Sequence, residues 1–314
     1  MPKEALRHLP LTYQVKVLGC RVNHAEVREI STLLESRGMM PASAPKMPDL
    51  TVVHTCSVTS AAAAKSRNAI RRARKASPTQ SGGFSDVLVT GCYTGTDPQR
   101  AIELAGGQDR VIPHRHADGT GMIQRLESTV DRWLGRRTAA DQPAIQQSIP
   151  KTSIHQLPVL LPNQPARHSR AEVRIQDGCD ACCTFCILPR VRGKVRSKDV
   201  KDVVREVERL VDLGHKEIVL SGIFLGAYGH TTALRRKQVN GHARPLADLL
   251  DAVASVPGLL RVRLSSLEPG DLSQELLDAM IAHQDIVAAH LHLPLQSGSD
   301  RILSRMNRQY RRTE

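Results

Sequence analysis

The stretch Gly178–Pro189, GCDACCTFCILP, places three cysteines close together in the second half of this 314-residue chain. Three residues separate Cys179 from Cys183, and two separate Cys183 from Cys186. Cysteine thiolates are the usual ligands of iron–sulfur clusters, and a [4Fe-4S] cluster takes four of them. A loop that supplies only three thiolates leaves one iron for a different ligand. The spacing therefore predicts a cluster with one open coordination position.

Two other interpretations of this loop are less favoured. Cys179 with Cys182, and Cys183 with Cys186, form two CxxC pairs, the element of a structural zinc site. Zinc sites separate their two pairs by roughly a dozen or more residues, whereas these pairs are adjacent. A disulfide framework is the second alternative. It fits poorly because the chain opens without a signal peptide and is long enough to bury a core without cross-links.

Three further cysteines share one local setting. Cys20 follows YQVKVLG, Cys56 follows LTVVHT and Cys92 follows DVLVTG, so that each comes after an apolar run and opens a turn. If the runs are strands of one parallel sheet, the three thiolates meet at its carboxyl edge, where open α/β sheets build their sites. A single buried cysteine is often only a small hydrophobe. Three at strand ends predict a second cluster with an open iron.

The spacing of apolar residues predicts an alternation of strands and helices on both sides of an irregular stretch. Before it, we expect strands at residues 15–18, 50–53 and 87–90, and helices at residues 23–37 and 61–75. Residues 139–170 lose this alternation and contain five prolines, which predicts a linker. The expected division is thus an N-terminal domain at residues 1–138, a linker at 139–170 and a second domain at 171–314.

The second domain repeats the strand–helix unit four times. The expected strands are residues 173–175, 217–220, 261–264 and 290–293, and the expected helices are residues 200–213, 246–256 and 272–282. Such a series predicts a parallel sheet with right-handed crossovers, curved as in part of a TIM-like barrel. Because sites in these sheets lie at the carboxyl ends of strands, the candidate cofactor-binding residues are Ser221, Gly222, Ser265, Ser266, Glu268 and Gln296. Turn formation and helix capping are the alternative roles for these serines and this glycine.

Several segments resemble one enzyme family. LGCRVN (18–23), TCSVTSAAAAKSRNAIRRA (55–73) and VTGCY (89–93) are similar to the N-terminal domain of the methylthiotransferases. IQDGCDACCTFCILPRVRGKVRS, EIVLSGIFLGAYG, RVRLSSLEPG and LHLPLQSGSDRILSRMNRQY resemble their radical S-adenosylmethionine (SAM) domain. The segments follow the family's order over almost the whole chain. CRVN, KSRNAIRRA and SSLEPG most resemble the branch that modifies threonylcarbamoyladenosine in tRNA. The branches that act on isopentenyladenosine in tRNA, or on an aspartate of a ribosomal protein, remain alternatives.

The resemblance implies a fold, cofactors and a reaction. The fold is an N-terminal open α/β methylthiotransferase domain followed by an incomplete radical-SAM partial TIM-like barrel. One [4Fe-4S] cluster would be held by Cys179, Cys183 and Cys186, and would reduce SAM to start radical chemistry. An auxiliary [4Fe-4S] cluster would be held by Cys20, Cys56 and Cys92, and would deliver sulfur. The product would carry a methylthio group on carbon 2 of N6-threonylcarbamoyladenosine, the adenosine just 3′ of the tRNA anticodon.

Composition agrees with a polyanionic partner. Lysine and arginine total 44 against 31 acidic residues, which gives a net charge of +13 and favours contact with phosphates. Arg67, Arg71 and Arg72 are candidate RNA contacts, although a charged run is often only a solvated helix face. The expected partners are the tRNA anticodon loop and an external electron donor, with a sulfur donor that the sequence does not identify. No segment reaches the ~20 apolar residues of a membrane span, so we expect a cytoplasmic protein.

The sequence departs from the family at four places, one of which is a longer, basic loop at residues 231–244. His54 stands where the family usually has asparagine, and Cys182 stands where it usually has an aromatic or other apolar residue. The chain stops at Glu314, whereas the resemblance implies further barrel strands and a C-terminal RNA-binding barrel domain, so we expect a truncated chain. Two other classes of function therefore stay open. One is an inactive iron–sulfur fragment that binds RNA, and the other is an electron-transfer protein.

Overall fold

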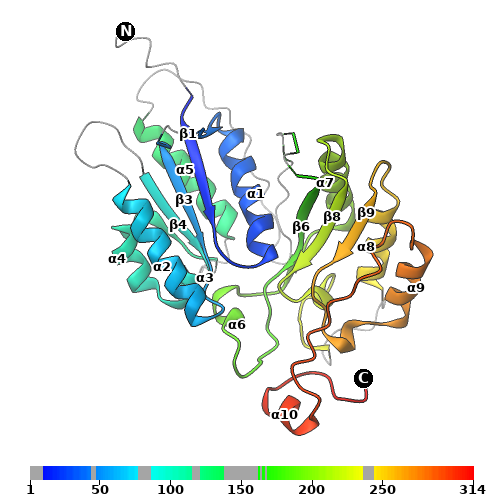
Figure 1. Ribbon diagram of the computed structural model, residues 1–314. Helices are drawn as coiled ribbons and strands as arrows, with labels where there is room; N and C mark the ends of the chain where they lie inside the picture. Colours follow the sequence, from blue (N-terminus) through cyan, green and yellow to red (C-terminus); the bar gives the residue numbers. More distant parts are fainter. Residues whose placement is uncertain are drawn as a thin grey trace. The chain divides into compact units, whose positions relative to one another are not determined.

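The computed structural model describes residues 10–43, 47–76, 86–114, 121–137, 162, 165–166, 168–235 and 244–314. The chain is α/β (Figure 1) and divides into two compact units at residues 149 and 150, with His24–Glu26 grouped with the second unit. Most of the expected linker at residues 139–170, including its boundary at residue 138, lies outside the described residues. Among the helices described, none is long and apolar enough to cross a membrane.

The first unit is built on a five-stranded sheet in the order β2-β1-β3-β4-β5, with all neighbouring strands parallel. Its strands are β1 (Thr12–Val17), β2 (Met40–Pro41), β3 (Leu50–Thr55), β4 (Asp86–Gly91) and β5 (Val111–Ile112). Its helices are α1 (Arg21–Ser36), α2 (Ser60–Lys75), α3 (Cys92–Thr96), α4 (Pro98–Ala105) and α5 (Met122–Arg137). The three expected strands and two expected helices are confirmed. β2 and β5 are additions, each too short to leave a periodic signal.

The helices of this unit form two layers (Figure 1). Arg37, at the end of α1, pairs with Glu127 at 2.6 Å and Asp131 at 2.9 Å on α5. On α2 and α4, Ile70 and Ala101 belong to one buried apolar cluster. The strand order explains these layers. After β1 the chain adds β2 on one side of it, and then adds β3, β4 and β5 in turn on the other side. The order therefore reverses between β1 and β3, where open α/β sheets form their ligand sites.

The second unit is built on a four-stranded sheet in the order β7-β6-β8-β9. Its strands are β6 (Arg170–Asp177), β7 (Arg196–Ser197), β8 (Glu217–Gly222) and β9 (Arg261–Leu264). β6, β8 and β9 run parallel, whereas the short β7 is antiparallel to β6. Its helices are α6 (Leu188–Val191), α7 (Val200–Asp212), α8 (Pro245–Ala254), α9 (Gln274–Ala282) and α10 (Asp300–Arg305).

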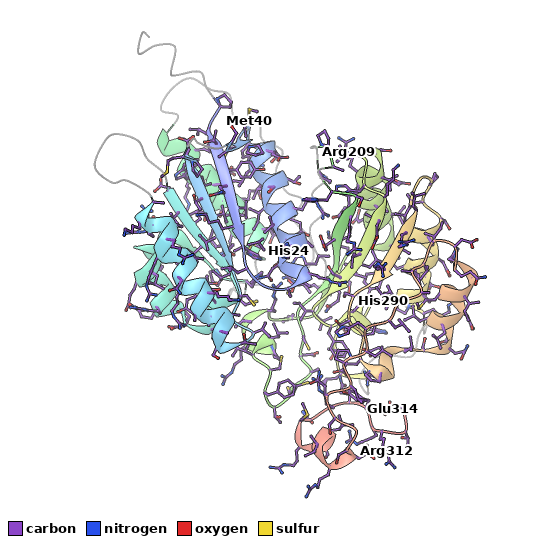
Figure 2. The ribbon with its side chains drawn as sticks, in the orientation of Figure 1. His24, Met40, Arg209, His290, Arg312 and Glu314 are labelled. Carbon is purple, nitrogen blue, oxygen red and sulfur yellow. The ribbon has the colours of Figure 1, made fainter. Side chains whose placement is uncertain are left out.

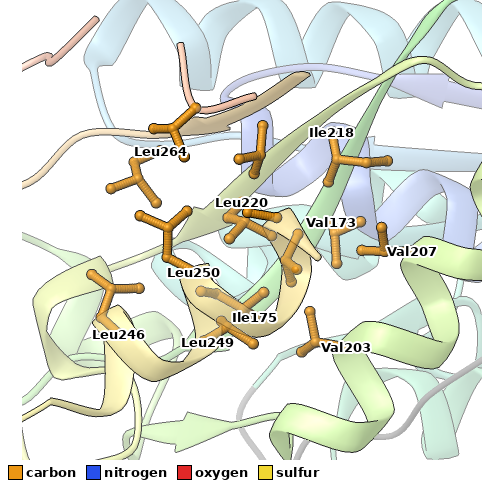
Figure 3. Close-up of a cluster of buried hydrophobic side chains, with 14 of the residues drawn as sticks. Val173, Ile175, Val203, Val207, Ile218, Leu220, Leu246, Leu249, Leu250 and Leu264 are labelled. Atoms are coloured by element: carbon orange, nitrogen blue, oxygen red, sulfur yellow. The ribbon is translucent and has the colours of Figure 1, made fainter. Parts of the chain in front are cut away.

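A continuous apolar core lies between this sheet and its helices (Figure 3). Val173 and Ile175 alternate along β6, while Val203 and Val207 lie one turn apart on α7, and all four are fully buried. This arrangement follows from the sequence, because a strand places every second side chain on one face and a helix places residues four apart on one stripe. Burying each such side chain contributes about 1.5–3 kcal/mol.

The expected fourth strand at residues 290–293 is wrong. Only one parallel bridge, Val262 with Val287, joins this part of the chain to β9. The backbone then continues without a ladder, apart from single bonds such as Leu267 N to His292 O at 3.1 Å. The reason is that β9 ends at Leu264, so the chain beyond residue 288 has little strand left to pair with. The sheet accordingly has three parallel strands rather than four.

Candidate functional site

The first unit brings its three cysteines to one edge of the sheet. Cys20 lies between β1 and α1, Cys56 directly follows β3, and Cys92 is the first residue of α3 after β4. β1, β3 and β4 are neighbours, and Thr55 pairs with Gly91 in the register that precedes Cys56 and Cys92. Cys20 is exposed, whereas the other two are buried. We call Cys20, Cys56 and Cys92 the sheet-edge trio.

The loops of the sheet-edge trio pack closely. Gly19 has a φ of +116°, and a Cβ atom there would lie 2.8 Å from Cys56 Cβ and 3.0 Å from its Sγ. Only glycine fits both this left-handed backbone and this approach. Asn23 then ties the loops together, because its Nδ2 donates to Leu18 O at 2.6 Å and to Thr55 O at 3.1 Å. The Cys20 thiol lies 3.6 Å from Asn23 Oδ1.

A second polar side chain fastens Cys56 to α2. Ser66 Oγ accepts the Cys56 N–H at 3.0 Å and donates to Cys56 O at 2.7 Å. Sequence reasoning did not single out either Ser66 or Asn23 as a functional residue. Asn23 had a signal, since it is the last residue of CRVN, three positions after Cys20.

The cysteines of the second unit lie in one loop after β6. Cys179 is buried, Cys183 and Cys186 are half-buried, and Cys182 is exposed. Ala181 N–H points to Cys179 Sγ at 3.4 Å, and Cys186 N donates to Cys183 O at 3.1 Å. We call Cys179, Cys183 and Cys186 the loop trio. All seven cysteines of the chain are free thiols in this structure.

The loop trio is an unfavourable place for uncompensated thiolates. Burial raises the pKa of the Cys179 thiol, the Ala181 N–H opposes that shift, and the neighbouring Cys183 and Cys186 add to it, so that the pKa stands at about 12. Three thiolates that repel one another in a buried loop need a cationic group between them. Iron supplies such a charge, so the donor set fits an iron–sulfur cluster.

Gln176 connects the start of this loop to the loop after β8. Its Nε2 donates to Asp177 O at 3.1 Å and to Gly178 O at 2.8 Å, while its Oε1 accepts Phe224 N–H at 2.8 Å. Gly222 was predicted to bind a cofactor. In the structure a Cβ atom at Gly222 would lie 3.0 Å from both Cβ and Oε1 of Gln176, so a side chain there would crowd Gln176 and packing favours a glycine.

Asp177, also at the start of the loop, is a buried carboxylate among arginines. Arg174, Arg192 and Arg196 approach it at 2.9, 3.1 and 3.2 Å. Burial raises the pKa of Asp177, but the three guanidinium groups outweigh burial and lower that pKa to about 2. Its Oδ1 accepts the Gly178 N–H at 2.8 Å, so the ionised carboxylate anchors the residue next to Cys179.

The predicted cofactor-binding serines lie at the carboxyl ends of β8 and β9. Ser221 is buried and donates to Val173 O on β6 at 3.2 Å. Ser265 is buried, and its hydroxyl has no hydrogen-bond partner among the described residues. Ser266 is exposed and lies 2.7 Å from Nδ1 of His292. Gln296 is exposed, with a φ of +62°.

The Glu268 carboxylate, predicted to bind a cofactor, forms ion pairs with two arginines. Arg235 NH2 donates to it at 3.0 Å, and Arg308 NH1 donates to its other oxygen. Burial raises the pKa of Glu268, and the arginines oppose that shift only in part. The sequence could not show this engagement, because Arg235 and Arg308 lie far from Glu268 along the chain.

The three predicted RNA contacts lie on α2 with different exposure. Arg71 and Arg72 are exposed, and Arg71 NH1 donates to Asn68 Oδ1 at 3.1 Å. Arg67 is half-buried, with its guanidinium carbon 5.9 Å from the centre of the Tyr93 ring. Arg67 therefore points toward the residue after Cys92, whereas Arg71 and Arg72 face solvent.

The two single residues that depart from the family pattern, His54 and Cys182, lie in different surroundings. His54 is fully buried on β3, and its ring centre lies 5.8 Å from that of His114 in an edge-on arrangement. Cys182 is exposed, with its thiol 3.4 Å from Asp180 O. It therefore stands apart from the buried Cys179 in the same loop.

Comparison with known families divides the chain in two. Residues 12–113 match the family described as "Uncharacterized protein family UPF0004", and residues 173–314 match the radical SAM superfamily. The first match contains the sheet-edge trio, and the second contains the loop trio.

The most similar relatives include tRNA-modifying enzymes. The chain is 34% identical over 299 residues to "Threonylcarbamoyladenosine tRNA methylthiotransferase MtaB" of Bacillus subtilis, covering 95% of this chain and 60% of that protein. It is 35% identical over 304 residues to "tRNA-2-methylthio-N(6)-dimethylallyladenosine synthase" of Parafrankia sp., covering 96% and 56%. The MtaB of Aquifex aeolicus is 31% identical, with 95% and 66% covered. The chain thus spans about 60% of the length of the curated relatives it matches.

Solved structures show the same fold at low sequence identity. The radical SAM methyltransferase TsrM from Kitasatospora setae, solved with tryptophan and a SAM analogue, superposes with a TM-score of 0.58 at 16% identity, covering 94% of this chain and 61% of that one. The cobalamin-dependent SAM radical enzyme OxsB, solved with aqua-cobalamin and SAM, gives 0.54 at 11% identity, covering 99% and 47%. The α/β order of both units therefore has solved counterparts.

Proposed function

Because the chain belongs to the radical SAM methylthiotransferase family, we propose that it takes part in adding a methylthio group to an adenosine of tRNA. One observation carries the proposal. Each unit presents three cysteines where parallel strands end, so the chain offers two separate sets of three sulfur ligands. The names of the relatives support tRNA as the substrate class.

We assign one [4Fe-4S] cluster to the loop trio and a second to the sheet-edge trio. Three free thiols in each trio fit such a group, and N–H groups aimed at sulfur, such as that of Ala181, suit cluster sulfur atoms. When bound, the clusters and SAM would supply the electron transfer, the radical chemistry and the transferred sulfur.

The chain's own residues contribute position and shelter. Gln176 and Asp177 fix the backbone from which Cys179 extends, so that the loop trio keeps one geometry. Burial of Cys179 keeps water away from that side of the loop. Ser265, whose hydroxyl is buried and available, is the best candidate to bind SAM. Ser221, Gly222, Ser266, Glu268 and Gln296 remain further candidates at the same strand ends.

The proposed partner is the anticodon loop of tRNA. An unpaired loop base is accessible without opening a duplex, and the net charge of +13 favours phosphate contact. Arg71 and Arg72 are exposed on α2 and can meet phosphates, while Arg67 extends toward Tyr93. An external electron donor and a sulfur donor complete the proposed set of partners.

The proposed substrate is N6-threonylcarbamoyladenosine. The sequence motifs CRVN and SSLEPG support the threonylcarbamoyladenosine branch, as do the MtaB relatives. A second candidate is the isopentenyl-type adenosine, because the dimethylallyladenosine synthase of Parafrankia is 35% identical to the chain.

The first test counts the clusters. We would reconstitute the chain anaerobically and measure iron and acid-labile sulfide, in parallel with a Cys179→Ala, Cys183→Ala, Cys186→Ala variant. We expect about eight irons per chain, falling to about four in the variant. No iron loss in the variant would refute the assignment of a cluster to the loop trio.

The second test identifies the substrate. The reconstituted chain would receive SAM, a reductant and tRNA bearing either threonylcarbamoyladenosine or isopentenyladenosine, and the nucleosides would be analysed by mass spectrometry. A methylthio product only on the first tRNA supports the proposal. A product only on the second favours the alternative branch. A parallel reaction with small-subunit ribosomal protein in place of tRNA, analysed by protein mass spectrometry, tests the protein branch, which a methylthio group on that protein would favour. If the chain binds tRNA equally well without iron, an RNA-binding fragment is favoured instead. If the reduced chain does not cleave SAM, an electron-transfer protein is favoured.

A further inference from the structure

The segment after α10 lies against the loop trio. Thr184 N donates to Met306 O at 3.2 Å, and Asn307 Nδ2 donates to Cys182 O at 2.8 Å. Asn307 has a φ of +54°, the left-handed conformation that asparagine adopts after a helix end. Two loop residues that flank Cys183 are therefore bonded to this segment, which places the next residue, Arg308, beside the same cysteine.

Arg308 is largely buried at this place. Its side chain is 11% exposed, and its guanidinium carbon lies 5.1 Å from the centre of the Phe185 ring. NH1 donates to Glu268, which Arg235 holds from its other side. Phe185 stands between Cys183 and Cys186 in sequence, so the guanidinium lies against the part of the loop that joins these two members of the loop trio.

Arg308 and Glu268 form a pair of opposite charges at this loop. NH1 of Arg308 donates to one oxygen of Glu268, and the same guanidinium lies over the Phe185 ring of the loop. One fixed cation and one fixed anion therefore stand together beside the loop trio.

One donor of Arg308 has no acceptor. Its Nε atom is buried, and among the described residues no hydrogen-bond partner lies within reach of it. An unsatisfied buried N–H is costly and needs an explanation, and a bound ion or group that accepts its hydrogen is one such explanation. NH1 of the same side chain is already directed to Glu268.

We propose that Arg308 is a positioning residue that donates its Nε–H to a sulfur of the cluster held by the loop trio, and that the Arg308–Glu268 pair sets the reduction potential of that cluster. This inference rests on the proposed function, which places a cluster there. Reduction adds negative charge to a cluster, so a nearby cation and an N–H donor favour the reduced form and raise the potential. A nearby carboxylate lowers it.

The test measures the midpoint potential by redox titration with electron paramagnetic resonance detection. The 314-residue chain would carry Cys20→Ala, Cys56→Ala and Cys92→Ala, so that only the loop-trio cluster contributes. Arg308→Gln should lower the potential, so that the ratio of reduced to oxidised cluster at the parent midpoint falls about tenfold, which equals ~59 mV for one electron. Glu268→Gln should raise it, and Arg308→Lys, which keeps the charge but lacks Nε–H, should give a smaller fall.

Arg312→Gln is the matched control. Arg312 lies beside α10 on the same C-terminal segment and is exposed (Figure 2), so the variant removes the same charge without touching the loop. Its potential should equal that of the parent. Shifts of Arg308→Gln and Glu268→Gln in the same direction, or no shift in either, would overturn the proposal.

The design separates this inference from the proposed function. A parent chain that binds no iron at the loop trio would refute the proposed function itself. A parent that binds a cluster whose potential ignores Arg308 and Glu268 would refute only the inference. If Arg308→Gln fails to bind iron, Glu268→Gln decides, because its potential must rise if the pair acts through charge.

Discussion

The two cysteine trios reach a similar arrangement by different routes. The loop trio comes from a single loop after β6, and its three cysteines lie within eight consecutive residues, Cys179–Cys186. The sheet-edge trio comes from three strand ends, and only the order β1-β3-β4 brings it together. Each trio relies on one buried amide side chain, Gln176 or Asn23, to join separate loops. A local motif and a sheet topology can thus present the same ligand set.

The strongest test of this comparison removes one sulfur from each trio. Cys56→Ala and Cys183→Ala should each lower the iron content from about eight to about four per chain, because each cluster needs its three thiolates. Iron and sulfide analysis after anaerobic reconstitution would measure the change. Cys182→Ala is the control, since this exposed cysteine belongs to neither trio, and it should keep all the iron. A loss of all iron in Cys56→Ala would show that the two trios are not independent.

The next test weakens the support of the loop trio. Gln176→Ala removes three hydrogen bonds from a fully buried side chain and leaves the Phe224 N–H without its acceptor. We expect the free energy of unfolding to fall by about 1–3 kcal/mol, with iron lost from the loop trio only. Urea unfolding followed by circular dichroism would measure it. Gln274→Ala, on the exposed start of α9, should change it by less than about 0.5 kcal/mol.

The equivalent test for the sheet-edge trio is Asn23→Ala. It removes the donors to Leu18 O and Thr55 O, and we expect a loss of about 1 kcal/mol, because these carbonyl oxygens keep a second lone pair for another donor. Reconstituted iron should fall at this trio while the loop trio keeps its own. Asn68→Ala, on the exposed face of α2, is the control for an asparagine lost elsewhere. Equal iron in both variants would contradict the bridging role of Asn23.

The smallest expected effect on stability comes from Glu217, at the end of the second sheet opposite to the one from which the loop trio extends. Glu217 on β8 pairs with Arg170 on β6 at 2.9 Å and Arg263 on β9 at 2.6 Å. Burial raises the pKa of Glu217, but the two arginines outweigh burial and lower it below its usual value. Glu217→Gln should cost less than about 1 kcal/mol at neutral pH, and neither trio should lose iron.

The pH dependence of that loss has a definite sign. A lowered pKa stabilises the folded state above the unfolded pKa, which is about 4.3 for glutamate, and that stabilisation disappears as the pH falls through the folded value. The difference between wild type and Glu217→Gln should therefore shrink below about pH 4 and also in high salt. A difference that grows on acidification would contradict the ion-pair account.

Much of this architecture could be predicted from the sequence. The strands before Cys20, Cys56 and Cys92 were visible as apolar runs, and a parallel sheet then requires the cysteines to share an edge. The helix at α7 followed from the spacing of Val203 and Val207. These features are local, so a short window of sequence contains their signal.

What could not be predicted depends on distant partners. Gln176 bonds to Phe224, and Glu268 bonds to Arg235 and Arg308, so no local pattern reveals either role. The expected strand at residues 290–293 failed for the same reason, because its pairing depended on where β9 ends. The assignment of each cysteine trio to a cluster remains a prediction.

The strand order of the first unit also has a consequence for timing during synthesis. Cys20, Cys56 and Cys92 follow one another at equal intervals, so a growing chain must expose all of α2 and β4 before the third sulfur exists. N-terminal units generally fold first as the chain emerges, and closing these long intervals is entropically costly until the sheet has formed. We therefore expect the sheet-edge trio to receive iron only after its unit has folded. The compact loop trio can gather its sulfurs as soon as that short turn has been made.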